Sequence, residues 1–297
     1  ELLGDELEPP QPPSATVSVA IAMNRFAVIA RHPVTTVSFS LPRVRGQPRP
    51  ARPSAAVWAL VGALLLAAFN FFWGLGSPSY FTDEVFSIEH SLPSLGGIIH
   101  VVDRTELNPW GYFFLLHGWL HAIGSQAPWV TRLPSAIVGV LLVGAVFWTA
   151  RAFVGVGAAA GAALICAFNP VVLQYAQEVR MYVFAMLAVT VAVGATVRAL
   201  GRPAHAAHWL ALGAIGAILS MWFHYTAAFV VVPLCAWVAT RQALGLRARA
   251  IYVTVCSVSG LALIPIFREQ HHRMPNGGVT RLATLTVNNV LRVLGAP

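Results

Sequence analysis

Apolar runs long enough to cross a bilayer recur along this chain, and they restrict its fold more than any other sequence feature. Seven such runs occupy residues 57–75, 131–150, 153–173, 181–199, 207–223, 226–243 and 250–267. A helix rises 1.5 Å per residue, so each run spans roughly 25–32 Å, close to the hydrocarbon thickness of about 30 Å. Because 57% of the 297 residues are hydrophobic, the sequence predicts an all-α polytopic membrane protein with about seven transmembrane helices.

The stretch Trp110–Gly124 is also apolar, but its 15 residues, with two histidines and two tryptophans, favour a helix lying along the membrane interface. If this stretch crossed the bilayer, every later loop would change side and the membrane would separate Asp83 from Glu178. If it does not cross, the basic loops share the cytoplasmic side, as the positive-inside rule prefers. The opposite side then receives all the acidic residues that follow residue 53, namely Asp83, Glu84, Glu89, Asp103, Glu106, Glu178 and Glu269.

The non-crossing arrangement divides the chain into three parts. Residues 1–53 are expected to form a disordered, Pro/Arg-rich cytoplasmic arm. Residues 54–267 form the transmembrane domain, with a first outer loop at 76–130 and outer turns at 174–180 and 224–225. Residues 268–297 are expected to be an outer segment at the start of a truncated C-terminal part.

Asp83 and Glu84 lie in the segment SYFTDEVFS, directly after the first apolar run. On a helix the two side chains project about 100° apart, so one can face the protein while the other faces water or a metal ion. The functional interpretation makes Asp83 a general base, since a carboxylate at a partly dry surface is a better proton acceptor. The structural alternative is that Thr82, Asp83 and Glu84 cap an interfacial helix.

The segment NPVVLQYAQEVRMY at 169–182 places a dense polar turn between two apolar runs. Its Asn169-Pro170 pair is expected to disturb the outer end of a span. Arg180 can grip a phosphate with its planar donors, and Glu178 can coordinate a cation, orient a sugar hydroxyl or hold Arg180. The structural alternative is an interfacial anchor with a water-screened ion pair. The candidate binding residues of this turn are Tyr175, Gln177, Arg180 and Tyr182.

Further candidate contacts for a lipid phosphate or a sugar lie near the same surface. Arg104 and Asn108 precede the interfacial helix, and Arg132 begins the second apolar run. His224 and Tyr225 form the third outer turn. The structural alternatives are a solvated loop, an arginine snorkelling to headgroups and interfacial aromatic anchors.

Familiar nucleotide-binding and hydrolase motifs are missing from the sequence, which contains no dinucleotide-binding glycine loop, no Walker lysine and no nucleophile elbow. A donor substrate must therefore already reside in the membrane. The chain has 19 arginines against 11 acidic residues. In a membrane protein such an excess of positive charge sets the orientation in the bilayer and binds anionic lipid headgroups, so we expect no nucleic-acid partner.

Four segments in order, TDEVFS, NPWGYFFLLHGWLHAIG, RLPSAIVGVLLV and NPVVLQYAQEVRMY, resemble the GT-C glycosyltransferases of the protein-mannosyltransferase and aminoarabinose-transferase branch. The resemblance runs from about residue 57 to residue 267. It implies a GT-C-like polytopic enzyme that takes a sugar from a polyprenyl-phosphate donor. Such an enzyme transfers the sugar with inversion, at the extracytoplasmic face, to a lipid, glycan or protein acceptor. Mannose is the default sugar, with arabinose next.

The resemblance also implies roles for individual residues. It places the family's first-loop acidic site on Asp83, with Glu84 beside it, and the acid of the second outer loop on Glu178. A divalent cation, Mg²⁺ or Mn²⁺, is a candidate cofactor at Asp83 and Glu178. Aminoarabinose transferases carry a lysine just before the juxtamembrane helix, where this chain has Asn108 or its neighbours. An arginine would have to replace that cation, and the candidates are Arg104, Arg132 and Arg180.

Two other functions compete with an enzyme of the bacterial plasma membrane. One is a transporter or flippase of lipid-linked sugars, and the other is an inactive truncated homologue. Transporters favour charged or broken helices near the bilayer midplane, whereas the charges here cluster at the outer ends of the apolar runs. This distribution favours the glycosyltransferase.

Overall fold

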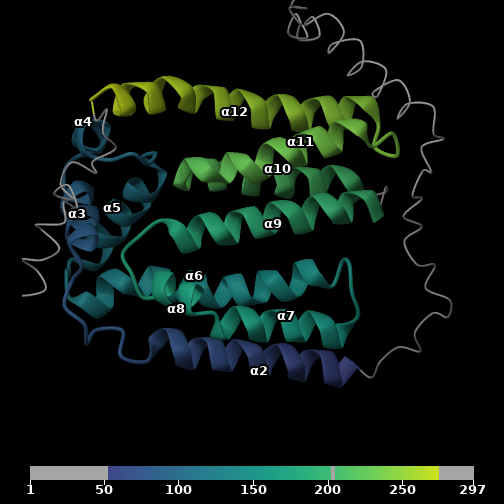
Figure 1. Cartoon of the computed structure of the whole chain (residues 1–297), viewed down its shortest axis with the longest axis horizontal. Coiled ribbons are helices and arrows are strands. Elements are labelled where there is room, and N and C mark those ends of the chain that lie inside the picture. The colour runs from purple at the N-terminus through teal and green to yellow at the C-terminus, as the bar shows by residue number, and fades with distance from the viewer. Residues whose placement is uncertain (1–52, 202–204, 274–297) are drawn as a thin grey trace, which may run out of the picture. The chain divides into compact units, whose positions relative to one another are not determined.

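The computed structural model describes residues 53–201 and 205–273, all of which belong to one compact unit. Long apolar helices run side by side, and shorter helices gather at one end of them (Figure 1). The described residues are helices and loops without a strand, which confirms the predicted all-α polytopic class. Residues 1–52 of the predicted arm and residues 274–297 of the predicted outer segment lie outside the described part.

Seven helices of the bundle follow the seven predicted runs in order. They are α2 (Pro53–Phe72), α6 (Pro128–Ala150), α7 (Val156–Phe168), α9 (Tyr182–Gly201), α10 (Ala206–Phe223), α11 (Ala228–Thr240) and α12 (Leu246–Arg273). Four of them, α6, α9, α10 and α12, are long and apolar enough to cross a membrane. The number rises to five if α7 and the short helix after it make one broken span. The predicted number of seven spans is therefore not confirmed.

The break after α7 comes from the Asn169-Pro170 pair. Helix α7 ends at Phe168, and α8 (Pro170–Ala176) starts again at an angle of 60°. The Asn169 side chain accepts hydrogen bonds from the backbone N–H groups of Val171 and Val172 at 2.9 and 3.2 Å. Proline fits the first helical position, because an N–H there would have no partner within the helix. The expected disturbance of this span is confirmed.

Small residues let the central helices approach closely. A Cβ atom added at Gly216 of α10 would lie only 2.6 Å from the carbonyl oxygen of Ala188 on α9. At Gly194 of α9, a Cβ atom would lie 2.5 Å from the ring of Trp148 on α6. Lipid tails are as apolar as the side chains of the helices, so the hydrophobic effect does not drive helices together within the bilayer. Close van der Waals contact between small residues provides the packing energy instead.

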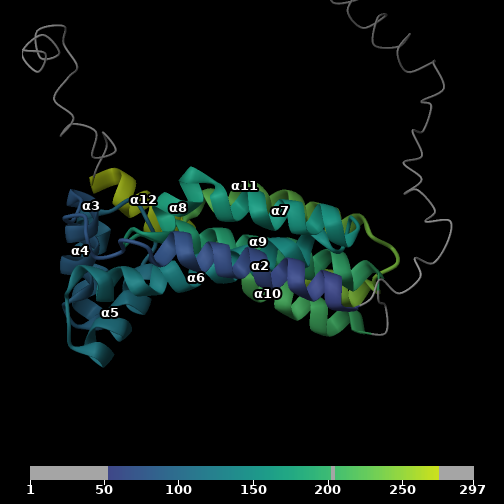
Figure 2. The ribbon, with the colours of Figure 1, turned by 90° about the horizontal axis from the view of Figure 1, so that it is seen from below.

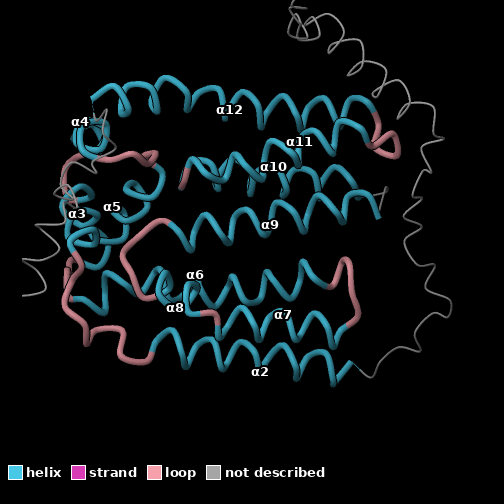
Figure 3. Tube along the Cα trace, viewed as in Figure 1, coloured by secondary structure: helices cyan, strands magenta, loops and turns pink. Residues whose placement is uncertain are grey.

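Short helices form one end of the unit, which we call the site end. They are α3 (Thr82–Ser91), α4 (Leu95–Thr105), α5 (Gly111–Ile123) and the 3₁₀ turn η2 (Tyr225–Ala227), together with α8. Figures 1 and 2 show α3, α4 and α5 beyond the ends of α2 and α9, at the end into which α6 and α12 also reach. Figure 3 shows the loops between α6 and α7 and between α11 and α12 at the opposite end.

Helix α5 is the apolar stretch that was expected to lie along the interface. Its 13 residues reach about 20 Å, well short of a hydrocarbon core of about 30 Å. One face, with Tyr112, Phe113, Leu116 and Leu120, is buried against the rest of the unit. The length and the one-sided burial agree with a helix that packs at the site end without crossing.

Helix α12 extends beyond the predicted end of its span at residue 267. It continues to Arg273, which donates a hydrogen bond from Nε to Glu269 at 2.7 Å. Residues 268–273 of the predicted outer segment thus continue this helix, and the position of the membrane boundary stays a prediction. The i,i+4 ion pair between Glu269 and Arg273 supports the helix beyond its apolar part.

Candidate active site

Helix α3 lies at the site end and gives its two adjacent acids different surroundings. The side chain of Asp83 is 64% exposed, whereas Glu84 is 1% exposed. This difference follows from the 100° between neighbouring positions on a helix. The prediction that one acid faces the protein and the other faces outward agrees with this geometry.

Glu84 is held by Arg132 of α6, which is itself only 3% exposed. Nε and Nη2 of Arg132 donate to the two carboxylate oxygens of Glu84, each at 2.8 Å. The remaining N–H groups donate to the carbonyl oxygens of Leu75, Pro78 and Ser79 at 2.9 to 3.1 Å. A guanidinium has five N–H donors, and all five are used here. This geometry leaves Arg132 without a free N–H group for the predicted contact with a phosphate or with lipid headgroups.

Glu84 also joins two segments that are far apart in the chain. Its carboxylate accepts hydrogen bonds from the backbone N–H groups of Phe81 at 2.9 Å and of Val179 at 3.0 Å. Burial acts to raise the pKa of Glu84, but the hydrogen bonds from Arg132, Phe81 and Val179 outweigh it and hold the pKa below its ordinary value. Glu84 is thus a charged, fully bonded anchor between α3 and the turn at 177–181.

Arg180, in that turn, lies against the start of α3 and is 6% exposed. Its Nη1 donates to the carbonyl oxygen of Asp83 at 3.3 Å and to Oγ of Ser87 at 3.2 Å. Two carboxylates lie just beyond hydrogen-bond distance, Asp83 Oδ2 at 3.9 Å from Nη2 and Glu106 Oε1 at 3.7 Å from Nη1. Burial acts to lower the pKa of Arg180, but Glu106 and its other neighbours raise it above the ordinary value. Unlike Arg132, this cation has donor capacity left, since its Nε has no partner.

Aromatic rings continue the site from Arg180 toward η2. The guanidinium lies 5.7 Å from the ring centre of Tyr182, which is 4.4 Å from Tyr175 and 5.3 Å from His224. Burial and the nearby Arg180 lower the pKa of His224. Its Nδ1 accepts a hydrogen bond from the N–H of Thr226 at 3.2 Å. The geometry brings together Tyr175, Arg180, Tyr182 and His224, four of the predicted binding residues.

Two predicted residues of the 169–182 segment contact the protein's own polar groups. Nε2 of Gln177 donates to the carbonyl oxygens of Asn70, Phe71 and Trp73 at 3.0 to 3.3 Å, at the end of α2. The amide nitrogen of Gln177 therefore caps the end of α2. Glu178 is half-buried and accepts a hydrogen bond from Gln174 at 2.7 Å. Among residues 53–201 and 205–273, no three His, Cys, Asp or Glu side chains are arranged to hold a metal ion.

The remaining predicted residues lie at the rim of the site. Arg104, in the last turn of α4, is exposed. Gln270 of α12 is fully buried; it donates to the backbone oxygen of Asn108 at 3.0 Å and accepts from the hydroxyl of Tyr225 at 2.9 Å. Asn108 and Tyr225 therefore fasten α12 to the site end. The structure does not bring the side chain of Arg104 into the cluster around Arg180.

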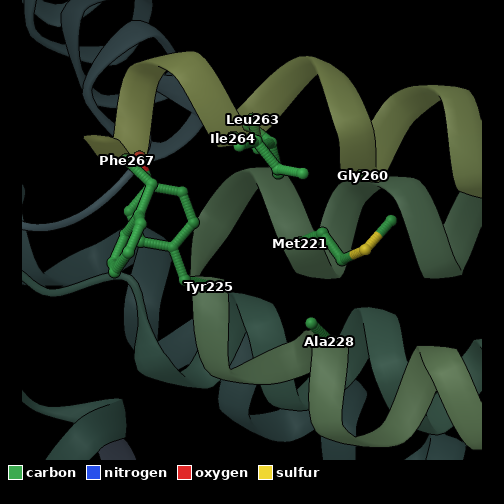
Figure 4. A pocket seen from close by; sticks show the side chains of 7 residues that line it. All are labelled: Met221, Tyr225, Ala228, Gly260, Leu263, Ile264 and Phe267. Atoms are coloured by element: carbon green, nitrogen blue, oxygen red, sulfur yellow. The ribbon is translucent and has the colours of Figure 1, made fainter. Parts of the chain in front are cut away.

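An apolar cavity of about 240 Å³ lies next to η2, between α10, α11 and α12 (Figure 4). Its walls include Met221, Tyr225, Leu263, Ile264 and Phe267. Since Tyr225 directly follows His224, this cavity adjoins the aromatic side of the site. A slot without charged walls suits a hydrocarbon chain.

Sequence reasoning did not identify Ser87 and His90 as site residues. Both are buried on α3, and their contacts reach Arg180 and Glu106. They follow Asp83 by four and seven residues, the spacing of side chains on one helical face. That periodicity is the signal that could have found them.

Comparison with known proteins gives one family. The family model described as dolichyl-phosphate-mannose-protein mannosyltransferase matches residues 107–267, which is more than half of the 297-residue chain. No curated protein and no solved structure matches the chain.

Proposed function

The chain belongs to the dolichyl-phosphate-mannose-protein mannosyltransferase family, and on that premise we propose that it moves mannose to an acceptor at the extracytoplasmic face of the membrane. The family and the apolar helices make it a membrane glycosyltransferase that depends on a polyprenyl-phosphate sugar. The mannosyl group, the lipid, glycan or protein acceptor, and the face of the membrane are the proposed parts.

The different surroundings of two neighbouring acids carry this proposal. Glu84 has both carboxylate oxygens saturated by hydrogen bonds. Asp83 is exposed, and among the described residues the cation that approaches its carboxylate is Arg180, at 3.9 Å. A general base must have a lone pair free for the incoming proton. Asp83 therefore acts as the base, and Glu84 positions the start of α3.

In the proposed reaction, Asp83 takes the proton of the acceptor hydroxyl. The acceptor oxygen forms a new bond to the anomeric carbon as the bond from that carbon to the donor phosphate breaks. The electron pair of the broken bond leaves with the phosphate, and the configuration at the anomeric carbon inverts. Because the leaving phosphate is a weak base, positive charge from Arg180 stabilises it without a general acid. A divalent cation at Asp83 and Glu178 is the alternative source of that charge.

The lipid part of the donor has a suitable neighbour in the apolar cavity. The cavity wall at Tyr225 is next to His224, whose ring stacks toward Tyr182 beside Arg180. A prenyl chain in the cavity and a phosphate near Arg180 would hold the anomeric carbon at one interface. Such orientation supplies a large share of the rate of a two-substrate reaction.

The distribution of charge supports the proposed orientation. The acidic residues of the described part all lie in α3, in α4 and its C-cap, in the turn at 177–181 or at the end of α12. The opposite end carries Arg151 and Arg241 in its loops and Arg247 and Arg249 in the first turn of α12, without an acid among the described residues. Positive charge favours the cytoplasmic side, so the site end faces outward.

Asp83→Asn tests the proposed function, and Glu89→Gln is the matched control because Glu89 is exposed on the same helix. Membranes that contain each variant receive radiolabelled polyprenyl-phosphate mannose and a mixture of lipid, glycan and peptide acceptors. We expect Asp83→Asn to lower formation of a new glycoside at least about 100-fold, the lower range for loss of a general base. Glu89→Gln should equal the wild type.

Two outcomes would contradict the proposal. If the label changes leaflet without entering a new glycosidic bond, the chain is a transporter. If Asp83→Asn transfers sugar as the wild type does, Asp83 is not the base.

A further inference from the structure

One carboxylate oxygen at the site end faces two buried nitrogen atoms. Oε1 of Glu106 lies 3.6 Å from Nδ1 of His90 and 3.7 Å from Nη1 of Arg180. All three residues are at least nine-tenths buried. Both distances exceed that of a hydrogen bond, and Nδ1 of His90 has no hydrogen-bond partner. Buried polar groups are nearly always paired, so this arrangement calls for an explanation.

Hydrogen-bond bookkeeping identifies which nitrogen of His90 carries a proton. The Thr105 hydroxyl donates its one proton to the carbonyl oxygen of Val101 at 2.7 Å. The same hydroxyl oxygen lies 3.3 Å from Nε2 of His90. Since the hydroxyl proton is already used, the oxygen can only accept from the ring. Nε2 of His90 is therefore protonated.

This assignment leaves Nδ1 with a lone pair if the ring is neutral. That lone pair would face the negative oxygen of Glu106 across 3.6 Å, in a buried place where unfavourable contacts between acceptors are costly. One additional proton removes the conflict, whether it sits on Nδ1 of His90 or on the carboxyl group of Glu106. In either form the two side chains together carry no net charge.

We propose that His90 is a positioning residue that shares one proton with Glu106 and thereby reserves the charge of Arg180 for Asp83 and the donor phosphate. The inference rests on the proposed function for its consequence in catalysis. When the shared proton is present, it neutralises the pair of His90 and Glu106, and the positive charge of Arg180 balances the negative charge of Asp83. Without it, Arg180 must balance two carboxylates, and its attraction for a phosphate falls.

Among the described groups around the His90 ring, Glu106 is the one that can share a proton with it. On its own helix, the ring stacks with Phe86 at 5.8 Å, and from α5 it meets Phe113 at 6.1 Å. The other titratable groups of this part of α5 have different neighbours: the ring of Tyr112 packs against Phe184 at 5.3 Å, and Nδ1 of His117 contacts the backbone oxygen of Ser91 at 2.9 Å. From the turn at 177–181, the charged neighbour is Arg180, which cannot accept a proton.

His90→Gln tests the proposal, because the glutamine amide can still donate to Thr105 but cannot lend a proton to Glu106. We expect kcat/KM for polyprenyl-phosphate mannose to fall at least about tenfold, mainly through a higher KM for the donor. The double variant His90→Gln/Glu106→Gln removes the unbalanced carboxylate as well, and should return to within about threefold of the wild type. His117→Gln, the same change at a histidine bonded to a backbone carbonyl, is the control and should equal the wild type.

A purely structural role for His90 predicts no recovery when a second residue is changed. The proposal is overturned if His90→Gln keeps its donor KM, or if the double variant is no better than His90→Gln. If His90→Gln fails to accumulate in membranes, accumulation of the double variant supports the proposal and its failure contradicts it.

Thermal unfolding in detergent separates this inference from the proposed function. If the wild type transfers no sugar, the proposed function fails, but the unfolding midpoints still report the charge balance. His90→Gln should then lower the midpoint relative to His117→Gln, and adding Glu106→Gln should restore it. Additive losses from the two substitutions would refute the shared proton.

Discussion

Arg132→Met is the sharpest test of how the site end is held together. Methionine fills much of the arginine volume but leaves the Glu84 carboxylate, 1% exposed, without its bidentate partner. It also removes the donors that reach the carbonyl oxygens of Leu75, Pro78 and Ser79. Removal of one member of a buried ion pair typically costs about 3–5 kcal/mol.

For a domain of this size, each kcal/mol lost from the free energy of unfolding lowers the unfolding midpoint by about 2–4 °C. Arg132→Met should therefore lower the midpoint by roughly 6–20 °C, measured by circular dichroism in detergent. The double variant Glu84→Gln/Arg132→Met removes both charges of this pair and should recover at least about half of the loss. If the double variant is as unstable as Arg132→Met, the cost does not come from an unpaired Glu84 and the reasoning is refuted.

The lowered pKa of Glu84 adds a pH dependence with a definite sign. A carboxyl group whose pKa is lower in the folded state stabilises that state once both states are ionised. The advantage of the wild type over Glu84→Gln is therefore complete above the ordinary glutamate value of 4.5. It should shrink as the pH falls through the lowered value. An advantage that grows on acidification would contradict this assignment.

Three further predictions concern packing, sidedness and the source of positive charge. A Cβ atom at Gly111 would lie 2.6 Å from the carbonyl oxygen of Trp222, so Gly111→Ala should destabilise the protein by about 1–3 kcal/mol. Gly118→Ala, with nothing within 4 Å of its Cβ position, should not, and equal midpoints for the two variants would count against a tight contact between α5 and α10. In a variant without native cysteines, Asp83→Cys and Glu178→Cys should both react with a membrane-impermeant maleimide added outside, and labelling from opposite sides would disprove a common site. Chelation with EDTA should leave sugar transfer within about twofold, because a buried arginine already supplies cationic charge; a loss restored by Mn²⁺ would instead establish the divalent cation.

Much of the architecture could be predicted from local patterns. Apolar runs predicted the order of the bundle helices, and the Asn169-Pro170 pair predicted the break between α7 and α8. The short length of the 110–124 run predicted a helix too short to cross. These features depend on hydrophobic periodicity and backbone sterics, which neighbouring residues determine among themselves.

The partners of the site residues could not be predicted in the same way. Glu84 and Arg132 are 48 positions apart, and Arg180 reaches Ser87 across 93 positions. Such contacts depend on how three helices and a turn meet at the site end. The spacing of His90 from Asp83 was visible in the sequence, but nothing local indicated that Glu106 would face its ring.

The sequence by itself determined that this chain is a helical membrane protein with its acidic residues near the ends of helices, because the bilayer core penalises unpaired backbone groups and unpaired charges whatever the tertiary fold. Only the tertiary structure decided which charged side chains have all their hydrogen-bonding groups paired within the protein. Arg132 and Glu84 saturate each other's hydrogen-bonding groups, whereas the Asp83 carboxylate is exposed and the Arg180 guanidinium keeps one N–H group without a partner. Residue type does not distinguish these two pairs, and only the number of hydrogen-bond partners that folding brings to each one does.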